Sequence, residues 1–316
     1  MNILITGATG FIGRAVLHEL LNHSAHQVTA LIRGASDALA HGIDKIVVAS
    51  IDGTTQYHDS LRGIDVIIHT AAQVHKSENS GSRKTYQDIN VEGTLNLANQ
   101  ALASGVKRFI FISTIKVNGE YTHPSEPFTA DSPPAPVDPY AISKYEAEQA
   151  LLALSKKSEF ETVIIRPPLV YGPGVKANFL KLMNLIHKGL PLPFGSITNK
   201  RSLVSIGNLV NLICTCIDHP NAANNIFLVS DDDDLSTIEL SQKLAASMGT
   251  NNKFINIPPS LLFSMAFVLG KHNLANRLLR DLQADVTKTK TMLDWRPSTC
   301  VDDAIQETAV HFLEQL

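Results

Sequence analysis

The chain has 316 residues, of which 44% are hydrophobic and 18% are charged, and its net charge is -3 at neutral pH. Such a chain can form one large domain or two unequal ones with a sizeable core. Its slightly acidic balance gives no electrostatic basis for binding nucleic acid or an anionic membrane. The three cysteines have no C-x-x-C spacing, so we expect no metal site and no disulfide framework.

The N-terminal apolar run leads straight into a glycine turn, so the sequence predicts no signal peptide. The most hydrophobic later segment, residues 261–269, is too short to cross about 30 Å of hydrocarbon. We interpret it as a buried or partner-facing helix, with peripheral membrane contact as the alternative. We therefore expect a cytoplasmic protein without a transmembrane segment.

Residues 1–21 predict a buried strand, a glycine turn and a helix. Gly7 allows a tight exit from the strand, and Gly10 lets the backbone approach a pyrophosphate. Gly13 lets the helix pack closely on the sheet, with its amide-rich end facing the anion. The alternative is a structural turn without a ligand. The residues assigned to the cofactor in this segment are Gly7, Gly10, Phe11, Ile12 and Gly13.

The residue after the second expected strand, 27–32, bears on cofactor preference. NAD-binding folds usually place a carboxylate there to accept from the ribose 2′-hydroxyl. This sequence has Arg33 instead, which can pair with a 2′-phosphate. The sequence thus favours NADP(H), with NAD(H) still possible. Alternatively, Arg33 is solvated and only stacks on adenine.

Further strands are expected to alternate with helices, which predicts a Rossmann-type, doubly wound parallel sheet in an α/β protein. Residues 1–170 are expected to form the NAD(P)-binding domain, with a return segment near 202–228. Residues 171–316 would be mainly a smaller, irregular α/β substrate lobe, in which the aspartates 231–234 form a solvated loop. The other expected strands are 45–51, 65–72, 108–113 and 162–166, and the expected helices are 85–103 and 140–156.

Other candidates follow the expected strands. Ile51 and Asp52 would lie near the adenine, and small residues at Ala71 and Ala72 would let the backbone approach the cofactor. Two more cofactor candidates are Asn90, on the helix 85–103, and Ser113, at the end of the strand 108–113.

Tyr140 and Lys144 are four residues apart on an expected helix and so share a face. An ammonium beside a phenol favours the phenolate and lowers its pKa from about 10 toward the working range. The pair would then act as a general acid and base on a carbinol or carbonyl oxygen. Thr114 would supply a hydroxyl hydrogen bond to the same oxygen.

Four motifs occur in order: GATGFIG at 7–13, ST at 113–114, YAISK at 140–144 and RPPLVYGPG at 166–174. With them the whole chain resembles the extended short-chain dehydrogenases/reductases, and more narrowly the nucleotide-sugar epimerase/dehydratase family. The resemblance implies a catalytic triad of Thr114, Tyr140 and Lys144, in which Tyr140 and Lys144 also contact the cofactor. It also places Pro167 to Val170 beside the nicotinamide. A homodimer through helices near 85–104 and 140–156 is implied as well.

The resemblance also implies a UDP-sugar substrate. Asn178 follows the YGPG turn, where the family often binds a nucleotide diphosphate. Arg201 stands where the family often has an arginine on the sugar-nucleotide phosphate, and its alternative role is a surface salt bridge. Arg277 would give a second phosphate contact, and Lys116 is a further substrate-binding candidate.

The residues after Thr114 separate the possible activities. Family dehydratases have an Asp-Glu pair there, and this chain has Ile115-Lys116, which argues against dehydration. The segments STIKVNGE and FTADSPPAPVDPYAISKYEAE are similar to bacterial 4-ketoreductases of O-antigen synthesis. The leading hypothesis is therefore NAD(P)H-dependent reduction of a UDP-4-keto-6-deoxy-N-acetylhexosamine to a UDP-N-acetylquinovosamine-type product. The alternative is a UDP-hexose or UDP-N-acetylhexosamine 4-epimerase with tightly bound NAD, and a remote one is a non-catalytic cofactor-sensing protein.

Overall fold

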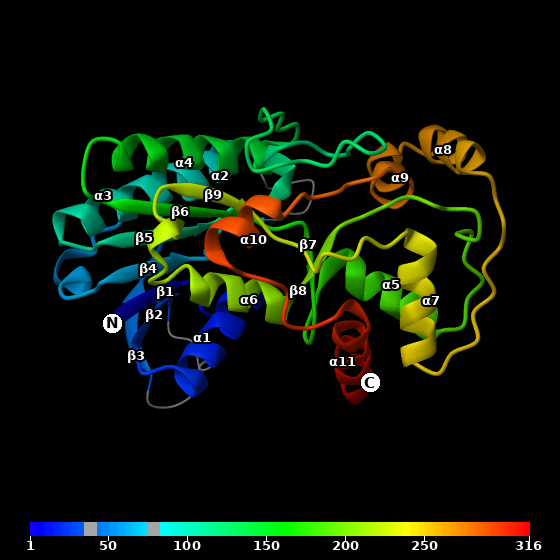
Figure 1. Cartoon of the computed structure of the whole chain (residues 1–316), viewed down its shortest axis with the longest axis horizontal. Helices are drawn as coiled ribbons and strands as arrows, with labels where there is room; N and C mark the ends of the chain where they lie inside the picture. The colour runs from blue at the N-terminus through cyan, green and yellow to red at the C-terminus, as the bar shows by residue number, and fades with distance from the viewer. Residues whose placement is uncertain (35–42, 75–82) are drawn as a thin grey trace.

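The computed structural model describes residues 1–34, 43–74 and 83–316, and it is built on one seven-stranded sheet (Figure 1). All six strand pairs are parallel, in the order β3-β2-β1-β4-β5-β6-β9. The expectation of a Rossmann-type, doubly wound sheet is therefore confirmed. The strands are β1 (Asn2–Thr6), β2 (Gln27–Arg33), β3 (Asp44–Val48), β4 (Val66–His69), β5 (Arg108–Ile112), β6 (Glu161–Arg166) and β9 (Asn225–Leu228).

The strand order reverses at β1, which pairs with β2 on one side and with β4 on the other. Leu4 lies opposite Thr29 of β2 and Ile67 of β4. In open parallel sheets, ligands bind outside the carboxyl ends of the strands at such a switch point. The end of β1 is followed by Gly7, so the fold places the glycine turn at this position.

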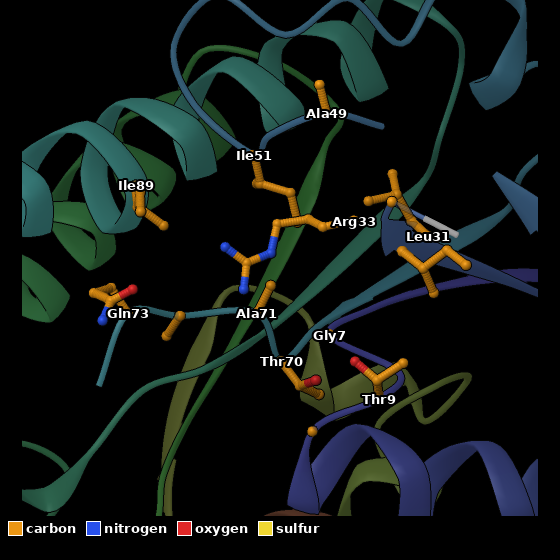
Figure 2. Close-up of a pocket in the computed structure, with 14 residues that line it drawn as sticks. Gly7, Thr9, Leu31, Arg33, Ala49, Ile51, Thr70, Ala71, Gln73 and Ile89 are labelled. Atoms are coloured by element: carbon orange, nitrogen blue, oxygen red, sulfur yellow. The ribbon is translucent and has the colours of Figure 1, made fainter. Parts of the chain in front are cut away.

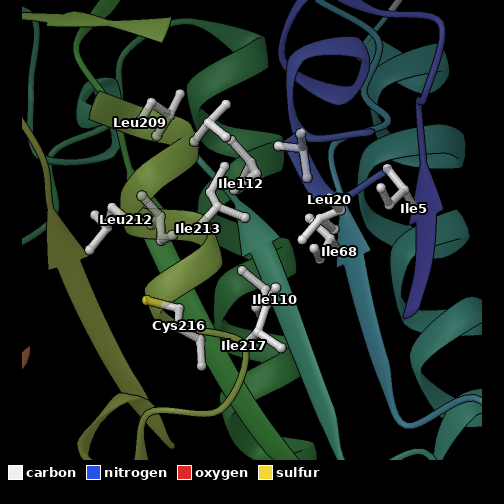
Figure 3. Packing of buried hydrophobic residues seen from close by; sticks show 14 of the residues in the cluster. Ile5, Leu20, Ile68, Ile110, Ile112, Leu209, Leu212, Ile213, Cys216 and Ile217 are labelled. Atoms are coloured by element: carbon white, nitrogen blue, oxygen red, sulfur yellow. The ribbon is translucent and has the colours of Figure 1, made fainter. Parts of the chain in front are cut away.

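Successive side chains along each strand point to opposite faces of the sheet and pack against two layers of helices. Ile3 and Ile5 face one layer, formed by α1 (Phe11–His23) and α6 (Ile206–Thr215), and Figure 3 shows the α6 side chains over Ile110 and Ile112 of β5. Leu4 and the β5 phenylalanines face the other layer, formed by α3 (Thr94–Ala103) and α4 (Pro139–Ser155). Both faces are buried, as the continuous apolar strands require.

The helix expected over 85–103 is interrupted. The structure has α2 (Arg83–Tyr86), a π-helical segment (Gln87–Gly93) and then α3. A Cβ atom on Gly93 would lie 2.5 Å from the carbonyl oxygen of Ile51, so the helix approaches this backbone more closely than a side chain allows. The wide turn also carries Asn90 inward, where its side chain is buried.

Two expected strands are shorter than predicted, because the chain leaves the sheet at its carboxyl edge. Segment 65–72 contributes only β4, and 45–51 contributes only β3. Ala49, Ile51 and the residues from Thr70 to Gln73 line a cavity instead. Both segments are as hydrophobic as strands, but their last residues lie beyond the sheet and line the cavity.

The second lobe has a core of its own around Tyr171, Phe179 and Leu244. A capping box of Ser236 and Glu239 opens α7. The lobe consists of β7 (Leu169–Tyr171), β8 (Leu203–Ser205), α5 (Ala177–His187), α7 (Thr237–Ser247), α8 (Pro259–Val268), α9 (His272–Leu279) and α11 (Val301–Glu314). Helix α10 (Thr287–Leu293) packs on β9, and short 3₁₀ turns occupy His58–Leu61, Ile115–Val117 and Pro220–Ala222.

The aspartate run is a solvated loop only in part, because Asp232 and Asp233 are exposed as expected but Asp231 is not. Asp231 is buried, and its carboxylate accepts hydrogen bonds from the Tyr171 hydroxyl, the Ser205 backbone and the Asn208 amide. Its pKa is raised by burial, which these hydrogen bonds oppose. The residue therefore joins β8, α6 and the second lobe.

No helix of the described residues is both long and apolar enough to cross a membrane.

Candidate active site

The glycine turn has the close contacts that a dinucleotide site requires. Gly7 has a φ of 70°, which favours glycine, and its carbonyl accepts from the backbone N–H of Gly10 at 2.8 Å. A Cβ atom on Gly13 would lie 2.2 Å from the Gly7 carbonyl oxygen. Helix α1 can therefore approach the end of β1 only without a side chain at this position.

A cavity of about 570 Å³ opens beside this turn, at the switch point of the sheet (Figure 2). Six of the predicted cofactor residues line it: Gly7, Gly10, Arg33, Ile51, Ala71 and Ala72. Arg33 is exposed, and Figure 2 shows its guanidinium directed between Ile51 and Ala71. None of the ion pairs among the described residues involves Arg33. The residues present therefore fit a nicotinamide dinucleotide.

Asp52 has a local role that the sequence did not indicate. Its carboxylate accepts from the backbone N–H groups of Thr54 and Thr55, at 2.9 and 3.1 Å, and from both threonine hydroxyls. Hydrogen bonds, first from Ser50 and then from Thr54, hold the pKa of Asp52 far below its usual value. The side chain thus closes its own turn, and Asp52 is not among the cavity residues.

Asn90 supports the cavity wall from behind. Its side chain accepts from the Gln73 N–H at 2.8 Å and donates to the Gln73 carbonyl at 3.1 Å. It also donates to the Ser143 hydroxyl, at 3.0 Å, on the face of α4 between Tyr140 and Lys144. Asn90 therefore joins the cavity loop to the catalytic helix, and it is not among the residues that line the cavity.

Phe11 and Ile12, also predicted at the cofactor, begin α1 and pack into hydrophobic clusters of the protein. Pro167 accepts the Ile115 N–H through its carbonyl, next to the 3₁₀ turn that follows Thr114. Val170 lies in β7, opposite Val204 of β8. None of these four residues is among those that line the 570 Å³ cavity.

An ion pair connects the segment after Thr114 to the start of α4. The Thr114 hydroxyl accepts from the Lys116 N–H and caps the 3₁₀ turn. The Lys116 ammonium pairs with Asp138, and with Glu120 at 3.9 Å. Asp138 in turn caps α4, accepting from the Ala141 N–H at 2.7 Å. Lys116 was predicted to contact substrate, and the structure instead gives its ammonium these two protein partners.

Tyr140 and Lys144 lie on one face of α4, but the expected effect on the phenol is wrong. Burial raises the pKa of Tyr140, and the charge of Asp138 adds to the shift. Burial also lowers the pKa of Lys144 to about 7, with Glu148 opposing the change. The Lys144 ammonium lies 3.7 Å from the centroid of the Phe111 ring. Loss of solvation therefore outweighs the attraction that the four-residue spacing suggested.

A buried network lies one turn beyond Lys144. Arg166 donates to both carboxylate oxygens of Glu148, and Asn118 accepts from the same guanidinium at 3.1 Å. The Ser113 hydroxyl also donates to Glu148, so this side chain supports α4. This network fixes the strand ends of β5 and β6 against the catalytic helix.

Sequence reasoning missed His69, the last residue of β4. Its ring lies 2.7 Å from the Thr6 hydroxyl and 3.1 Å from the Thr94 hydroxyl. Burial lowers the pKa of His69 to about 3, and the nearby charge of Lys144 acts in the same direction. A neutral imidazole therefore links β1, β4 and α3 directly before the cavity loop. The cavity residues Thr9, Thr70 and Gln73 were missed as well, although each adjoins or lies within a motif that was identified.

The second lobe brings two predicted phosphate ligands close together. Arg201 is half-buried and donates to the Arg280 carbonyl at 2.9 Å. Its pKa is lowered to about 10, first by burial and then by the charge of Arg277. Arg277 is exposed, and its charge also reaches Asp138. Asn178 is exposed at the start of α5. The predicted surface salt bridge of Arg201 does not occur among the described ion pairs.

Residues 3–230 match the model of the NAD dependent epimerase/dehydratase family. The chain belongs to this family. It is 45% identical to the UDP-glucose 4-epimerase of Vibrio cholerae, over 99% of this chain and 96% of that protein. Among solved structures, the UDP-glucose 4-epimerase of Thermotoga maritima with UDP-glucose superposes with a TM-score of 0.82. It is 24% identical, over 100% of this chain and 99% of the other.

The UDP-glucuronic acid 4-epimerase of Bacillus cereus in complex with NAD is similar in the same way. It gives a TM-score of 0.80 at 22% identity, over 100% of this chain and 99% of the other. The protein described by this structure is thus an NAD(P)-dependent enzyme of the nucleotide-sugar epimerase/dehydratase type. The comparisons agree better with the epimerase alternative than with the 4-ketoreductase that the sequence segments favoured.

Proposed function

We propose that this protein is a UDP-hexose 4-epimerase that interconverts UDP-glucose and UDP-galactose. The observation that carries the proposal is the 45% identity to the Vibrio cholerae UDP-glucose 4-epimerase over nearly the full length of both chains. The complete set of Thr114, Tyr140 and Lys144 supports an active enzyme over a protein that only senses a cofactor.

The cofactor would occupy the cavity at the glycine turn. The backbone of Gly7 and Gly10 would approach its pyrophosphate, and Arg33, Ile51 and Ala71 would border its adenosine half. When bound, the nicotinamide supplies a reversible hydride acceptor for C4 of the sugar. The chain itself would supply the proton chemistry and the orientation of the substrate.

Tyr140 would move a proton between its phenol oxygen and O4 of the hexose. The Thr114 hydroxyl would hydrogen-bond the same oxygen and keep it in line with the phenol. Because burial raises the pKa of Tyr140, the phenol holds its proton before the site is filled. A positive charge close to the phenol would favour the phenolate, so we expect proton removal to depend on bound oxidised cofactor.

The diphosphate of the nucleotide would bind between the two lobes at Arg201 and Arg277. Burial and then the charge of Arg277 lower the pKa of Arg201, and an anion placed between the two guanidinium groups would relieve their repulsion. Asn178 would contribute an amide donor from the start of α5. Arg201→Ala should therefore raise KM for the UDP-sugar more than it lowers kcat.

A second candidate function is the 4-ketoreductase named from the sequence. Arg33 favours it, because an exposed guanidinium at the cavity suits the 2′-phosphate of NADPH, the usual reductive donor. NADP(H) preference is therefore proposed together with this alternative, and NAD with the epimerase.

A substrate panel followed by NMR tests the proposal. UDP-glucose and UDP-N-acetylglucosamine would each be incubated without reductant, and UDP-4-keto-6-deoxy-N-acetylglucosamine would be incubated with NADPH or NADH. Formation of UDP-galactose supports the epimerase. Turnover of the 4-keto sugar alone would replace it with the reductase.

We also propose a homodimer that pairs α3 and α4 with the same helices of a second copy, as the family resemblance implies. Analytical ultracentrifugation at micromolar concentration should give twice the 34.4 kDa chain mass. Sedimentation as a monomer would refute it.

A further inference from the structure

Helix α8 exposes apolar side chains where a surface helix normally presents polar ones. Leu261, Met265 and Val268 recur at the spacing of one helical face and are 52%, 51% and 84% exposed. Phe267 and Leu269 extend this surface, at 74% and 66%. The opposite side of the helix carries Leu262, Phe263 and Ala266, which are half-buried. The helix therefore packs on the second lobe through this side, and the exposed side is additional apolar surface. We define the exposed apolar surface of α8 as Leu261, Met265, Phe267, Val268 and Leu269.

The charges of the chain segment that carries this surface have one sign. No acidic residue occurs between Glu239 and Asp281, in a chain whose net charge is -3. Lys253, Lys271 and Arg277 are exposed within that segment, and His272 stands beside Lys271, with its ring 6.2 Å from that of Phe267. Cations therefore directly follow the apolar end of the helix, and the rest of the chain carries the acidic excess.

We propose that α8 docks on the surface of an anionic lipid bilayer. The apolar side chains would enter the boundary between headgroups and acyl chains, and Lys271 and the neighbouring cations would lie at the level of the lipid phosphates. Ten residues of helix span about 15 Å, so α8 can lie in the interface but cannot cross it. Figure 1 shows α8 at an outer corner of the molecule, far from the N-terminal strands, where a flat surface can reach it.

A second copy of the chain fits this surface less well. A twofold contact through α8 would bring Lys271 and its neighbouring cations against the same cations of the other copy, without a carboxylate to pair with them. An anionic bilayer matches both the apolar face and the charge.

Flotation of the full chain with lipid vesicles tests the proposal. We expect binding to vesicles of phosphatidylcholine mixed with phosphatidylglycerol, and weaker binding to phosphatidylcholine alone or at high salt. Phe267→Ser combined with Val268→Ser should lower the partition coefficient at least tenfold, and Lys271→Glu should lower it on anionic vesicles only. Val310→Ser with Leu316→Ser, which removes two exposed apolar side chains from α11 and the C-terminus, is the matched control and should bind as the parent does.

All variants should keep the parent Tm and the parent turnover of soluble UDP-sugar, so the result is independent of the proposed activity. Parent protein that stays out of the floating fraction at low salt would overturn the proposal. So would binding that is unchanged in the Phe267→Ser, Val268→Ser variant. A dimer that this double variant dissociates, without any vesicle binding by the parent, would instead assign the surface to self-association.

Discussion

Arg166 holds Glu148 through both carboxylate oxygens, with its Nε at 3.0 Å from one and its Nη2 at 2.6 Å from the other. Both side chains are buried, at the carboxyl end of β6 and on the same helix as Lys144. A buried pair of this kind is costly to break, because the remaining charge is left without a counterion. It makes the position of the catalytic helix depend on a contact between β6 and α4.

Glu148→Gln should therefore destabilise the protein by about 3 kcal/mol, since Arg166 would lose its counterion. Urea unfolding at neutral pH measures the change. Glu146→Gln, half-exposed on the same helix, should stay within about 0.5 kcal/mol of the parent. Equal effects of the two substitutions would argue that the pair contributes nothing beyond surface charge.

Lys144→Met should increase stability at pH 7 by about 1–4 kcal/mol, because the folded protein no longer buries an amine that is protonated when unfolded. The same variant should lose about 10²–10⁴-fold in kcat. Burial lowers the pKa of Lys144 from 10.5 to about 7. Between these values the unfolded chain binds more protons, so parent stability should rise with pH relative to the variant. A stability difference that is constant from pH 7 to 10 would contradict the assigned pKa.

Arg33→Ala should weaken NADP(H) binding about 10–100-fold, because a charge-assisted hydrogen bond to the 2′-phosphate is lost. Its effect on NAD(H) binding should be under about threefold on the same argument. Isothermal titration of both cofactors measures the ratio, with Lys45→Ala, exposed on β3, as the matched loss of one cation. Equal weakening of both cofactors would mean that Arg33 contacts only the part that they share.

Gly13→Ala should abolish cofactor binding and destabilise the fold by about 1–3 kcal/mol, because the added Cβ would collide with the Gly7 carbonyl. Gly207→Ala is the matched control, since Gly207 lies early in α6 and nothing is within 4 Å of its added Cβ. There the same change should stabilise the protein by about 0.5–1 kcal/mol. Thermal unfolding and cofactor titration separate the two cases, and retained binding in Gly13→Ala would show that α1 can move away.

Tyr140→Phe should lower kcat at least about 100-fold and leave the cofactor Kd within a few fold, because only the proton-transferring oxygen is removed. Ser143→Ala, three residues further along α4, removes the hydroxyl that accepts from Asn90 and should lower kcat far less than Tyr140→Phe does. Substantial turnover in Tyr140→Phe would exclude the phenol as the acid and base.

The sheet could be predicted because its strands are short apolar runs followed by glycine or helical spacing. β1 falls in the apolar run at the start of the chain, where the sequence placed it. The ends of β3 and β4 could not be predicted, because the residues that follow these strands are as hydrophobic as a strand but line the cavity. The π-helical segment depends on Gly93 meeting the Ile51 carbonyl, a contact between residues that are 42 positions apart.

The residues of the site could be predicted where a motif determines the backbone conformation, as at Gly7 and Gly13. They were harder to predict where a polar side chain can bind either a ligand or another group of the protein. Asp52, Asn90 and Lys116 are polar residues at correctly identified segments, yet each satisfies groups of the protein itself. The predicted direction of the Tyr140 pKa shift was wrong, because spacing along a helix indicates which side chains are close but not how deeply they are buried.

Following deuterium at C4 of UDP-glucose during turnover distinguishes the epimerase from the reductase. The purified protein would be given UDP-[4-²H]glucose in ordinary water, with the nicotinamide absorbance recorded throughout. For an epimerase we expect UDP-galactose that keeps the deuterium at C4, with no net change in the absorbance of the nicotinamide. UDP-glucose left unchanged, while a UDP-4-keto sugar is reduced with one NADPH consumed per molecule, would contradict the epimerase and establish the reductase.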